Sequence, residues 1–156
     1  MNTLKKKSIV YDIMPRYITL LDDDIFEVRK SQIKNAGKGL YTTVPIQKGE
    51  YLMEYKGKKM RYSHNDHDHD YCYGITEKIC LNAADMKHGN KARFINDASG
   101  YSIESMSLKK KPKFSNNLEW KEIKDRVFIK ALKYIPENSE LYISYGDKYW
   151  KTRIIE

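Results

Sequence analysis

The sequence has little cysteine. Only Cys72 and Cys80 occur among 156 residues, which is too few for a framework of several disulfides or for a zinc site of four thiolates. We therefore expect two structural thiols in a reducing compartment, and we expect neither the fold nor the activity to need zinc.

Long apolar runs are also lacking. No stretch approaches the roughly 20 consecutive apolar residues of a membrane span. Three lysines at residues 5–7 lead into the mixed segment 8–12, which interrupts the apolar core that a signal peptide needs. These absences predict a soluble, intracellular protein with no membrane partner.

Charge is plentiful but unbalanced. Lysine and arginine number 29 against 21 aspartate and glutamate residues, which gives a net charge of +8. Such a surplus favours an acidic partner such as nucleic acid or chromatin, although solvated surface lysines also explain it. With 40% hydrophobic residues, the chain is long enough for one domain with a real core and too short for two comfortable ones.

Short stretches that alternate apolar and polar residues dominate the chain. We expect one short helix at residues 90–95, with Asn90 capping its first turn. Residues 1–25 are less regular and predict an N-terminal extension packed on a domain of residues 26–150, and residues 151–156 form a tail. The period of two predicts strands at residues 26–30, 51–55, 117–120, 126–131 and 141–145.

Four groups of residues carry the functional signal. They are Gly37-Lys38-Gly39, Arg93-Phe94-Ile95-Asn96, Asn116-Asn117 and Glu140-Leu141-Tyr142-Ile143-Ser144-Tyr145-Gly146. In this order and at this spacing the chain resembles the SET-domain protein lysine methyltransferases, from about residue 26 to residue 150. The resemblance implies a mainly β fold of several short sheets with few short helices and a knot-like threading of the C-terminal segment. It also implies methyl transfer to the side-chain amine of a lysine.

The resemblance implies S-adenosylmethionine as the cofactor. In the family the turn at residues 37–39 holds the methionine end of the cofactor, and glycine lets the backbone pass close to a ligand. The side-chain amide of Asn96 binds the amino-acid portion, and the backbone of Asp97 meets the adenine edge. The cofactor-binding residues implied in this way are Gly37, Lys38, Gly39, Arg93, Phe94, Asn96 and Asp97.

Two stretches depart from the pattern of the family. The family continues Asn-His-Ser-Cys where this chain has residues 96–99 as Asn-Asp-Ala-Ser, so the histidine's packing role is lost while backbone contacts are retained. Asn116 replaces the proline of a Pro-Asn pair, in which Asn117 matches the asparagine. A second hypothesis stays open because Asp97 replaces the family's histidine and the net charge is high. In it, a catalytically degenerate SET-like module binds basic tails or nucleic acid.

Aromatic residues are expected to build the catalytic channel. Tyr145 matches the family's catalytic tyrosine, and Tyr71 matches an aromatic residue that lines the narrow channel for the target lysine. Tyr149 and Trp150 would close this channel, because the chain lacks the cysteine-rich zinc modules of larger relatives. Ile143 stands where relatives carry a Phe or Tyr switch, and without a hydroxyl there we expect products beyond monomethyl-lysine. Core packing is the alternative for each aromatic residue.

The substrate that the resemblance implies is a histone or another basic protein, and the place of action is the nucleus or chromatin. Acidic residues near the cleft, with Glu54 among them, are candidates to attract a basic peptide. The lysine-rich segment 109–113 is a candidate to contact nucleosomal DNA. The sequence leaves the oligomeric state open.

A cluster of histidines and aspartates has the side-chain types of a transition-metal site. The segment is polar throughout and is typical of a solvated loop near the substrate cleft. We therefore expect no metal site there, and we expect its acids to face a basic peptide. The cluster consists of His64, Asp66, His67, Asp68, His69 and Asp70.

Overall fold

The computed structural model describes residues 7–13, 16–61, 71–76, 78–85, 87, 89–99, 113–146 and 149, with the side chains described from Ile18 onward. Strands dominate the described chain, and two short 3-10 helices, η1 (Asp23–Ile25) and η2 (Lys91–Phe94), lie between them. Within these ranges no helix has the length and apolar character to span a membrane.

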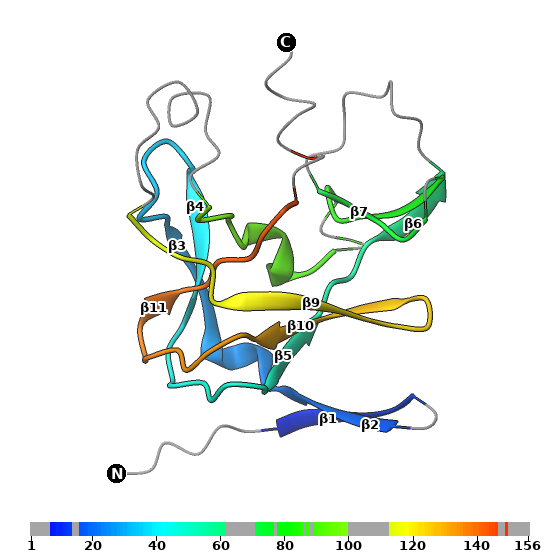
Figure 1. The fold of residues 1–156 in the computed structure, drawn as a ribbon, viewed down its shortest axis with the longest axis horizontal. Helices are drawn as coiled ribbons and strands as arrows, with labels where there is room; N and C mark the ends of the chain where they lie inside the picture. The colour runs from blue at the N-terminus through cyan, green and yellow to red at the C-terminus, as the bar shows by residue number, and fades with distance from the viewer. Residues whose placement is uncertain are drawn as a thin grey trace.

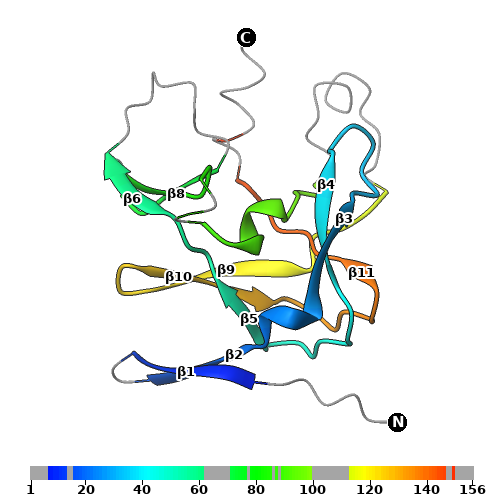
Figure 2. The same cartoon turned by 180° about the vertical axis from the view of Figure 1, so that it is seen from behind.

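The strands form three small sheets (Figures 1 and 2). All strand pairs are antiparallel except β2 and β5, which are parallel. The first sheet has the order β1 (Lys7–Ile13), β2 (Arg16–Leu21), β5 (Tyr51–Glu54), β10 (Arg126–Ala131) and β9 (Leu118–Ile123). The second has the order β11 (Ser139–Glu140), β4 (Lys38–Thr42) and β3 (Phe26–Lys30), and the third has the order β6 (Lys58–Arg61), β8 (Ile79–Asn82) and β7 (Cys72–Gly74).

The N-terminal segment is more regular than the sequence pattern predicts. β1 and β2 form an antiparallel hairpin, and β2 continues the main sheet by pairing with β5 (Figure 1). Ile18 and Leu20 of β2 are buried against Phe128 of β10. The expectation of an irregular segment over residues 1–25 is therefore wrong for the hairpin.

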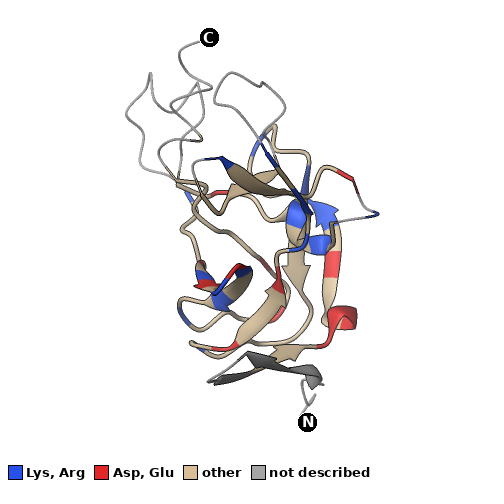
Figure 3. Ribbon diagram, turned by 90° about the vertical axis from the view of Figure 1, so that its right-hand side faces the viewer, with Lys and Arg blue, Asp and Glu red and all other residues tan. Residues whose placement is uncertain are grey.

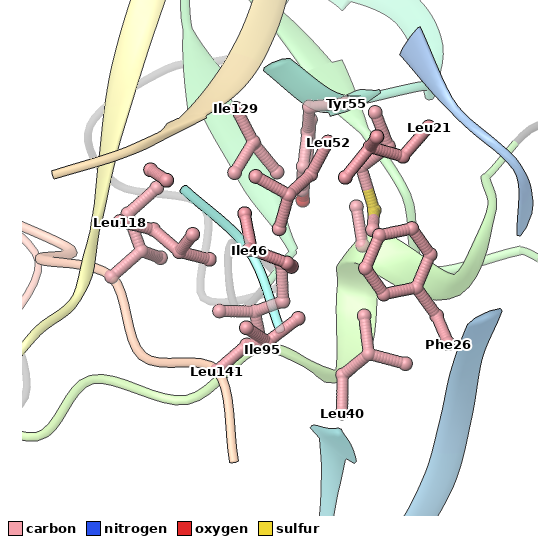
Figure 4. Close-up of a cluster of buried hydrophobic side chains, with 14 of the residues drawn as sticks. Leu21, Phe26, Leu40, Ile46, Leu52, Tyr55, Ile95, Leu118, Ile129 and Leu141 are labelled. Carbon is pink, nitrogen blue, oxygen red and sulfur yellow. The ribbon is translucent and has the colours of Figure 1, made fainter. Parts of the chain in front are cut away.

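One large hydrophobic core lies among the sheets and contains buried side chains from many segments of the chain (Figure 4). Phe26, Leu40 and Ile129 come from three strands and are at most 1% exposed. Burial of such a side chain contributes about 1.5–3 kcal/mol each. Ile95, next to η2, and Leu141, next to β11, join the same cluster. The two stretches that carry the expected site are thus anchored in the core.

The C-terminal segment does not form the expected strand at residues 141–145. It makes isolated parallel bridges instead, from Tyr142 to Asn96 and from Ile143 to Leu118. Because its two edges pair with two different stretches, the segment lies between the end of η2 and the start of β9 in both views (Figures 1 and 2). A regular ladder with one partner strand is therefore replaced by two short contacts.

Asn117 holds this inserted segment by its side chain. Its Oδ1 accepts a hydrogen bond from the Tyr142 N–H at 2.8 Å, and its Nδ2 donates to the Glu140 carbonyl at 3.0 Å. The position between two stretches is what a knot-like threading requires. Residues 100–112, which lie in the intervening connection, are outside the described residues.

The helix η2 forms where the sequence predicts it, but Asn90 does not cap it. The Asn90 side chain donates instead to the Glu54 carbonyl at 2.8 Å. Lys91 fastens the helix, because its Nζ donates to the Phe26 carbonyl at 3.0 Å and pairs with Asp23 Oδ2 at 3.0 Å. Asp23 belongs to η1, the acidic turn drawn in red in Figure 3. These contacts hold η2 against the start of β3.

Candidate active site

A loop precedes β4 and is closed by a hydrogen bond from the Ser31 N–H to the Gly37 carbonyl at 2.8 Å. Residues 37–39 at its end are called the glycine turn. Gly37 has a φ of +71°, which lies in the left-handed region that favours glycine. A Cβ added there would meet no atom within 4 Å. The backbone at Gly37 is therefore open to the close approach of a ligand.

Gly39 is required for a different reason. A Cβ at this position would collide with Oε1 of Glu140 and lie 3.4 Å from Nδ2 of Asn96. The missing side chain of Gly39 therefore makes room for an internal carboxylate, in addition to any ligand that the turn accepts.

Glu140 occupies the centre of the site, although it is only 2% exposed. Its Oε1 accepts hydrogen bonds from Ser31 Oγ at 2.7 Å and from Asn96 Nδ2 at 3.3 Å. Its Oε2 accepts from the Gln32 N–H and from the Tyr142 hydroxyl, each at 2.8 Å. One buried carboxylate thus joins the glycine turn, the end of η2 and the C-terminal segment.

Two phenols beside Glu140 remain protonated donors. Burial raises the pKa of Tyr142, and the Glu140 carboxylate that accepts its hydrogen bond raises it further. Burial and the same carboxylate also raise the pKa of Tyr41, whose hydroxyl lies 3.3 Å from Oε2. The sequence pattern predicts no separate role for Glu140, because it follows the polar residues 137–139 and its burial depends on contacts with distant residues.

Asn96 connects η2 to the glycine turn. Its Nδ2 donates to the Lys38 carbonyl at 2.9 Å and to Glu140 Oε1 at 3.3 Å, which engages both amide hydrogens. Its Oδ1 accepts no hydrogen bond from the residues that the structure describes. The side chain therefore presents an acceptor beside the turn.

Tyr145 is held at both its hydroxyl and its backbone. The hydroxyl donates to the Ile95 carbonyl at 2.5 Å, and the N–H donates to Asp97 Oδ2 at 2.8 Å. The ring packs edge-on against Tyr149 with centroids 4.7 Å apart. Burial, followed by Tyr149 and Asp97, raises the pKa of Tyr145 well above its ordinary value. With its proton directed at Ile95, the oxygen can offer only lone pairs to a neighbouring group.

The Arg93 side chain lies over the ring of Tyr71, the expected channel residue. The Arg93 guanidinium sits 4.4 Å from the Tyr71 ring centroid and 5.4 Å from that of Phe94. Tyr71, Phe94 and Tyr145 all pack against the main core. Ile143 is a member of that core at 1% exposure, and Trp150 lies outside the described residues.

A family model of the SET domain matches residues 37–146, which include the glycine turn, Asn96 and Tyr145. The chain belongs to the SET domain family. The structural neighbours confirm the expected fold for this SET domain, which is mainly β with several small sheets and few helices.

Two curated relatives are named as histone-lysine N-methyltransferases. EZH2 of Chaetomium thermophilum is 29% identical over 136 residues, covering 77% of this chain and 8% of the relative. The protein set-17 of Caenorhabditis elegans is 24% identical over 130 residues, covering 80% of this chain and 42% of the relative. The chain therefore spans less than half the length of these relatives.

Solved structures show the same fold. A humanized mutant of Chaetomium thermophilum Polycomb Repressive Complex 2 bound to the inhibitor GSK126 has a TM-score of 0.58 at 27% identity, covering 79% of this chain and 15% of that chain. The methyltransferase domain of human PR domain-containing protein 2 has a TM-score of 0.57 at 24% identity, and the match covers 78% of this chain and 77% of that domain's chain. An autoinhibited form of the Chaetomium complex bound to S-adenosylmethionine has a TM-score of 0.59 at 24% identity, and the match covers 83% of this chain and 16% of that chain.

A cluster of aromatic side chains, which the sequence pattern does not predict, supports the C-terminal segment of the SET domain. Trp120 packs on Tyr73 and Tyr55, with ring centroids 4.7 and 5.4 Å away. Its Nε1 donates to the Ser144 carbonyl at 2.8 Å, one residue before Tyr145. These residues come from three strands or their ends, so their proximity needs the tertiary structure.

Glu54 is not one of the acids that would attract a basic peptide. Its carboxylate forms a two-pronged contact with Arg126, with both N–O distances 2.7 Å, and this arrangement neutralises it. The histidine and aspartate cluster at 64–70 and the lysines at 109–112 lie outside the described residues. In the described part of the chain, no three His, Cys, Asp or Glu side chains come together as a metal site.

Cys72 and Cys80 are thiols and are not joined in a disulfide. They lie on the neighbouring strands β7 and β8, with the Sγ atoms of Cys72 and Cys80 3.0 Å apart. Burial raises the pKa of the Cys80 thiol.

Gly39→Ala should destabilise the SET domain more than Gly37→Ala. We expect Gly39→Ala to lower the free energy of unfolding by about 3 kcal/mol, because the methyl group displaces the Glu140 carboxylate from its donors. Gly37→Ala has open space and should cost about 1–2 kcal/mol through its positive φ. Urea denaturation measures both, and equal losses would show that Glu140 relaxes freely.

Proposed function

We propose that this SET domain is a protein-lysine N-methyltransferase that uses S-adenosylmethionine. The observation that carries the proposal is the placement of Tyr145, whose hydroxyl is directed by Ile95 while Asn96, the next residue, contacts the glycine turn. Two adjacent residues, Ile95 and Asn96, thus contact the tyrosine oxygen and the turn that is expected to bind the cofactor. The relatives named as histone-lysine methyltransferases and the neighbour bound to S-adenosylmethionine support the same function.

The residues of the turn fit the cofactor. The open backbone at Gly37 admits close approach, and Oδ1 of Asn96 is an acceptor for the ammonium of the methionine end. Gly37, Lys38 and Asn96 would hold that end, and the backbone of Asp97 would meet the adenine edge. When bound, S-adenosylmethionine supplies a methyl group activated by a positively charged sulfur.

The protein must present the target lysine as a neutral amine. With a pKa near 10.4, deprotonating a free lysine at pH 7 costs about 4.6 kcal/mol. The rings of Tyr71, Tyr145 and Tyr149 would desolvate the ammonium and so lower its pKa. The lone pairs of the Tyr145 oxygen would interact favourably with the positive charge on the cofactor's sulfur and on the methyl group being transferred. Alignment of the amine within a narrow channel would increase the rate further.

The proposed substrate is a histone or another basic protein, and the proposed place of action is chromatin in the nucleus. The names of the curated relatives support this choice. The net charge of +8 supports an additional contact with nucleosomal DNA. Such a contact would weaken steeply as salt concentration rises.

Calorimetry with Asn96→Ala tests the cofactor site. We expect S-adenosylmethionine to bind the parent, and Asn96→Ala to weaken binding by about 1–3 kcal/mol through a lost polar contact and a looser turn. Gln47→Ala, at an exposed position, is the control. Unchanged affinity in Asn96→Ala would remove Asn96 from the site.

Transfer of tritiated methyl groups to histones and to a whole-cell lysate tests the reaction itself. Labelled protein that depends on the parent SET domain is the expected result. Cofactor binding without transfer to any protein would instead favour the degenerate binding module.

A further inference from the structure

The Asp97 side chain has no part in the function proposed above, although it is only 8% exposed. Its Oδ2 accepts a hydrogen bond from the Tyr145 N–H at 2.8 Å, and its Oδ1 accepts one from the Ser99 N–H at 2.8 Å. Hydrogen bonds to an ionised acceptor are shorter and stronger than neutral ones. The carboxylate therefore ties the residues after η2 to the backbone of the expected catalytic tyrosine.

Asn116 also contacts this carboxylate. Its Nδ2 donates to Asp97 Oδ1 at 3.1 Å, and its Oδ1 accepts from the Ala98 N–H at 2.8 Å. A proline at position 116 could make neither contact. Asp97 and Asn116, which both depart from the family pattern, are thus in direct contact with each other.

Residues 95–97 link Tyr145 to the glycine turn. The Ile95 carbonyl accepts a hydrogen bond from the Tyr145 hydroxyl, and the Asp97 carboxylate accepts one from the Tyr145 N–H. Asn96, between them, donates a hydrogen bond to the Lys38 carbonyl of the glycine turn. A shift of Asp97 therefore moves the Tyr145 ring relative to the turn. Misplacement of a reacting group by about 1 Å can cost about 100-fold in rate.

We propose that Asp97 and Asn116 act as a coupled pair of positioning residues that fix Tyr145 for methyl transfer. Asp97 holds the Tyr145 backbone, and Asn116 holds the Asp97 carboxylate. The proposal rests on the proposed methyltransferase function and names residues that touch neither the amine nor the methyl group. Loss of the pair therefore lowers kcat and leaves the binding of both substrates nearly unchanged.

Asp97→Asn is the principal variant, because it keeps the shape of the side chain. An amide has one acceptor oxygen, so its NH2 group must face the N–H of either Tyr145 or Ser99. Below the melting temperature of every variant, we expect kcat to fall about tenfold while the cofactor Kd and the protein KM stay within about twofold. Asp125→Asn, at an exposed aspartate, is the control and should leave kcat unchanged.

Asn116→Ala tests the second member of the pair. We expect it to lower kcat about threefold, and we expect the double variant to lose less than the product of the two single losses, because both act through one carboxylate. Should Asp97→Asn fail to fold, Asn116→Ala decides alone: a lower kcat at constant Kd supports the proposal, and an unchanged kcat overturns it.

The amide proton of Tyr145 provides a measurement that does not depend on turnover. In NMR spectra its resonance should move upfield in Asp97→Asn and stay in place in Asp125→Asn. An unchanged kcat or an unchanged resonance in folded Asp97→Asn overturns the positioning role. A parent that methylates nothing overturns the proposed function and its catalytic consequence, whereas the resonance still shows whether Asp97 holds Tyr145.

Discussion

Tyr145→Phe should reduce methyl transfer by about two orders of magnitude or more, the scale on which one positioned polar group acts. The substitution removes the oxygen and keeps the ring, which packs against Tyr149 and the core. The fold and the affinity for S-adenosylmethionine should therefore stay close to those of the parent. Initial rates at saturating cofactor, together with calorimetry, measure the two effects separately.

Tyr142→Phe is the matched control from the same segment. The Tyr142 hydroxyl donates to Glu140, and its ring stacks on Phe114, so it faces different groups from Tyr145. We expect a stability loss of about 1 kcal/mol and a transfer rate close to that of the parent. If Tyr142→Phe abolishes transfer while Tyr145→Phe does not, the assignment of the catalytic tyrosine is wrong.

Glu140→Ala should lower the free energy of unfolding by at least about 3 kcal/mol. Truncation removes the acceptor of Ser31 Oγ, the Gln32 N–H and the Tyr142 hydroxyl. The contacts of Ser31 and Tyr142 are buried, and each buried donor left without a partner costs about 1–3 kcal/mol. Because these donors lie on separate segments, the glycine turn and the C-terminal segment should loosen together. Urea denaturation gives the free energy, and cofactor affinity reports on the turn.

Glu137→Ala supplies the control for this experiment. Glu137 is exposed and lies three residues earlier in the same loop and strand region. Its substitution should change stability by less than about 0.5 kcal/mol. A loss for Glu140→Ala no larger than that for Glu137→Ala would mean that water replaces the carboxylate at no cost.

Local sequence patterns predict β3, β5, β9 and β10, but not the other described strands. The alternation of apolar and polar residues gives β3 and β10 with the bounds that the structure has. The short helix also falls where the sequence indicates, as η2 (Lys91–Phe94). In each case the signal lies within a few consecutive residues, so distant contacts are not needed to read it.

Contacts between distant residues are the part that the sequence does not supply. Residues 141–145 alternate like a strand, yet they pair with two stretches, because Asn96 and Leu118 approach from opposite sides. Glycine at position 39 indicates close approach but does not tell whether a ligand or Glu140 approaches. The hairpin of β1 and β2 is different, since its β-branched and aromatic residues carry a strand signal that can be recognised locally.

The central position of Glu140 has a consequence for how the chain folds. Its contact with Ser31 joins residues 109 positions apart, and the contact of Asn96 with Lys38 spans 58 positions. The entropy lost in closing such long loops must be spent before the contacts compensate for it, which slows folding. The turn and Tyr145 are both held through residues that lie far apart along the chain. We therefore expect the site to be complete only in the fully folded chain, once the C-terminal segment lies between its two neighbours.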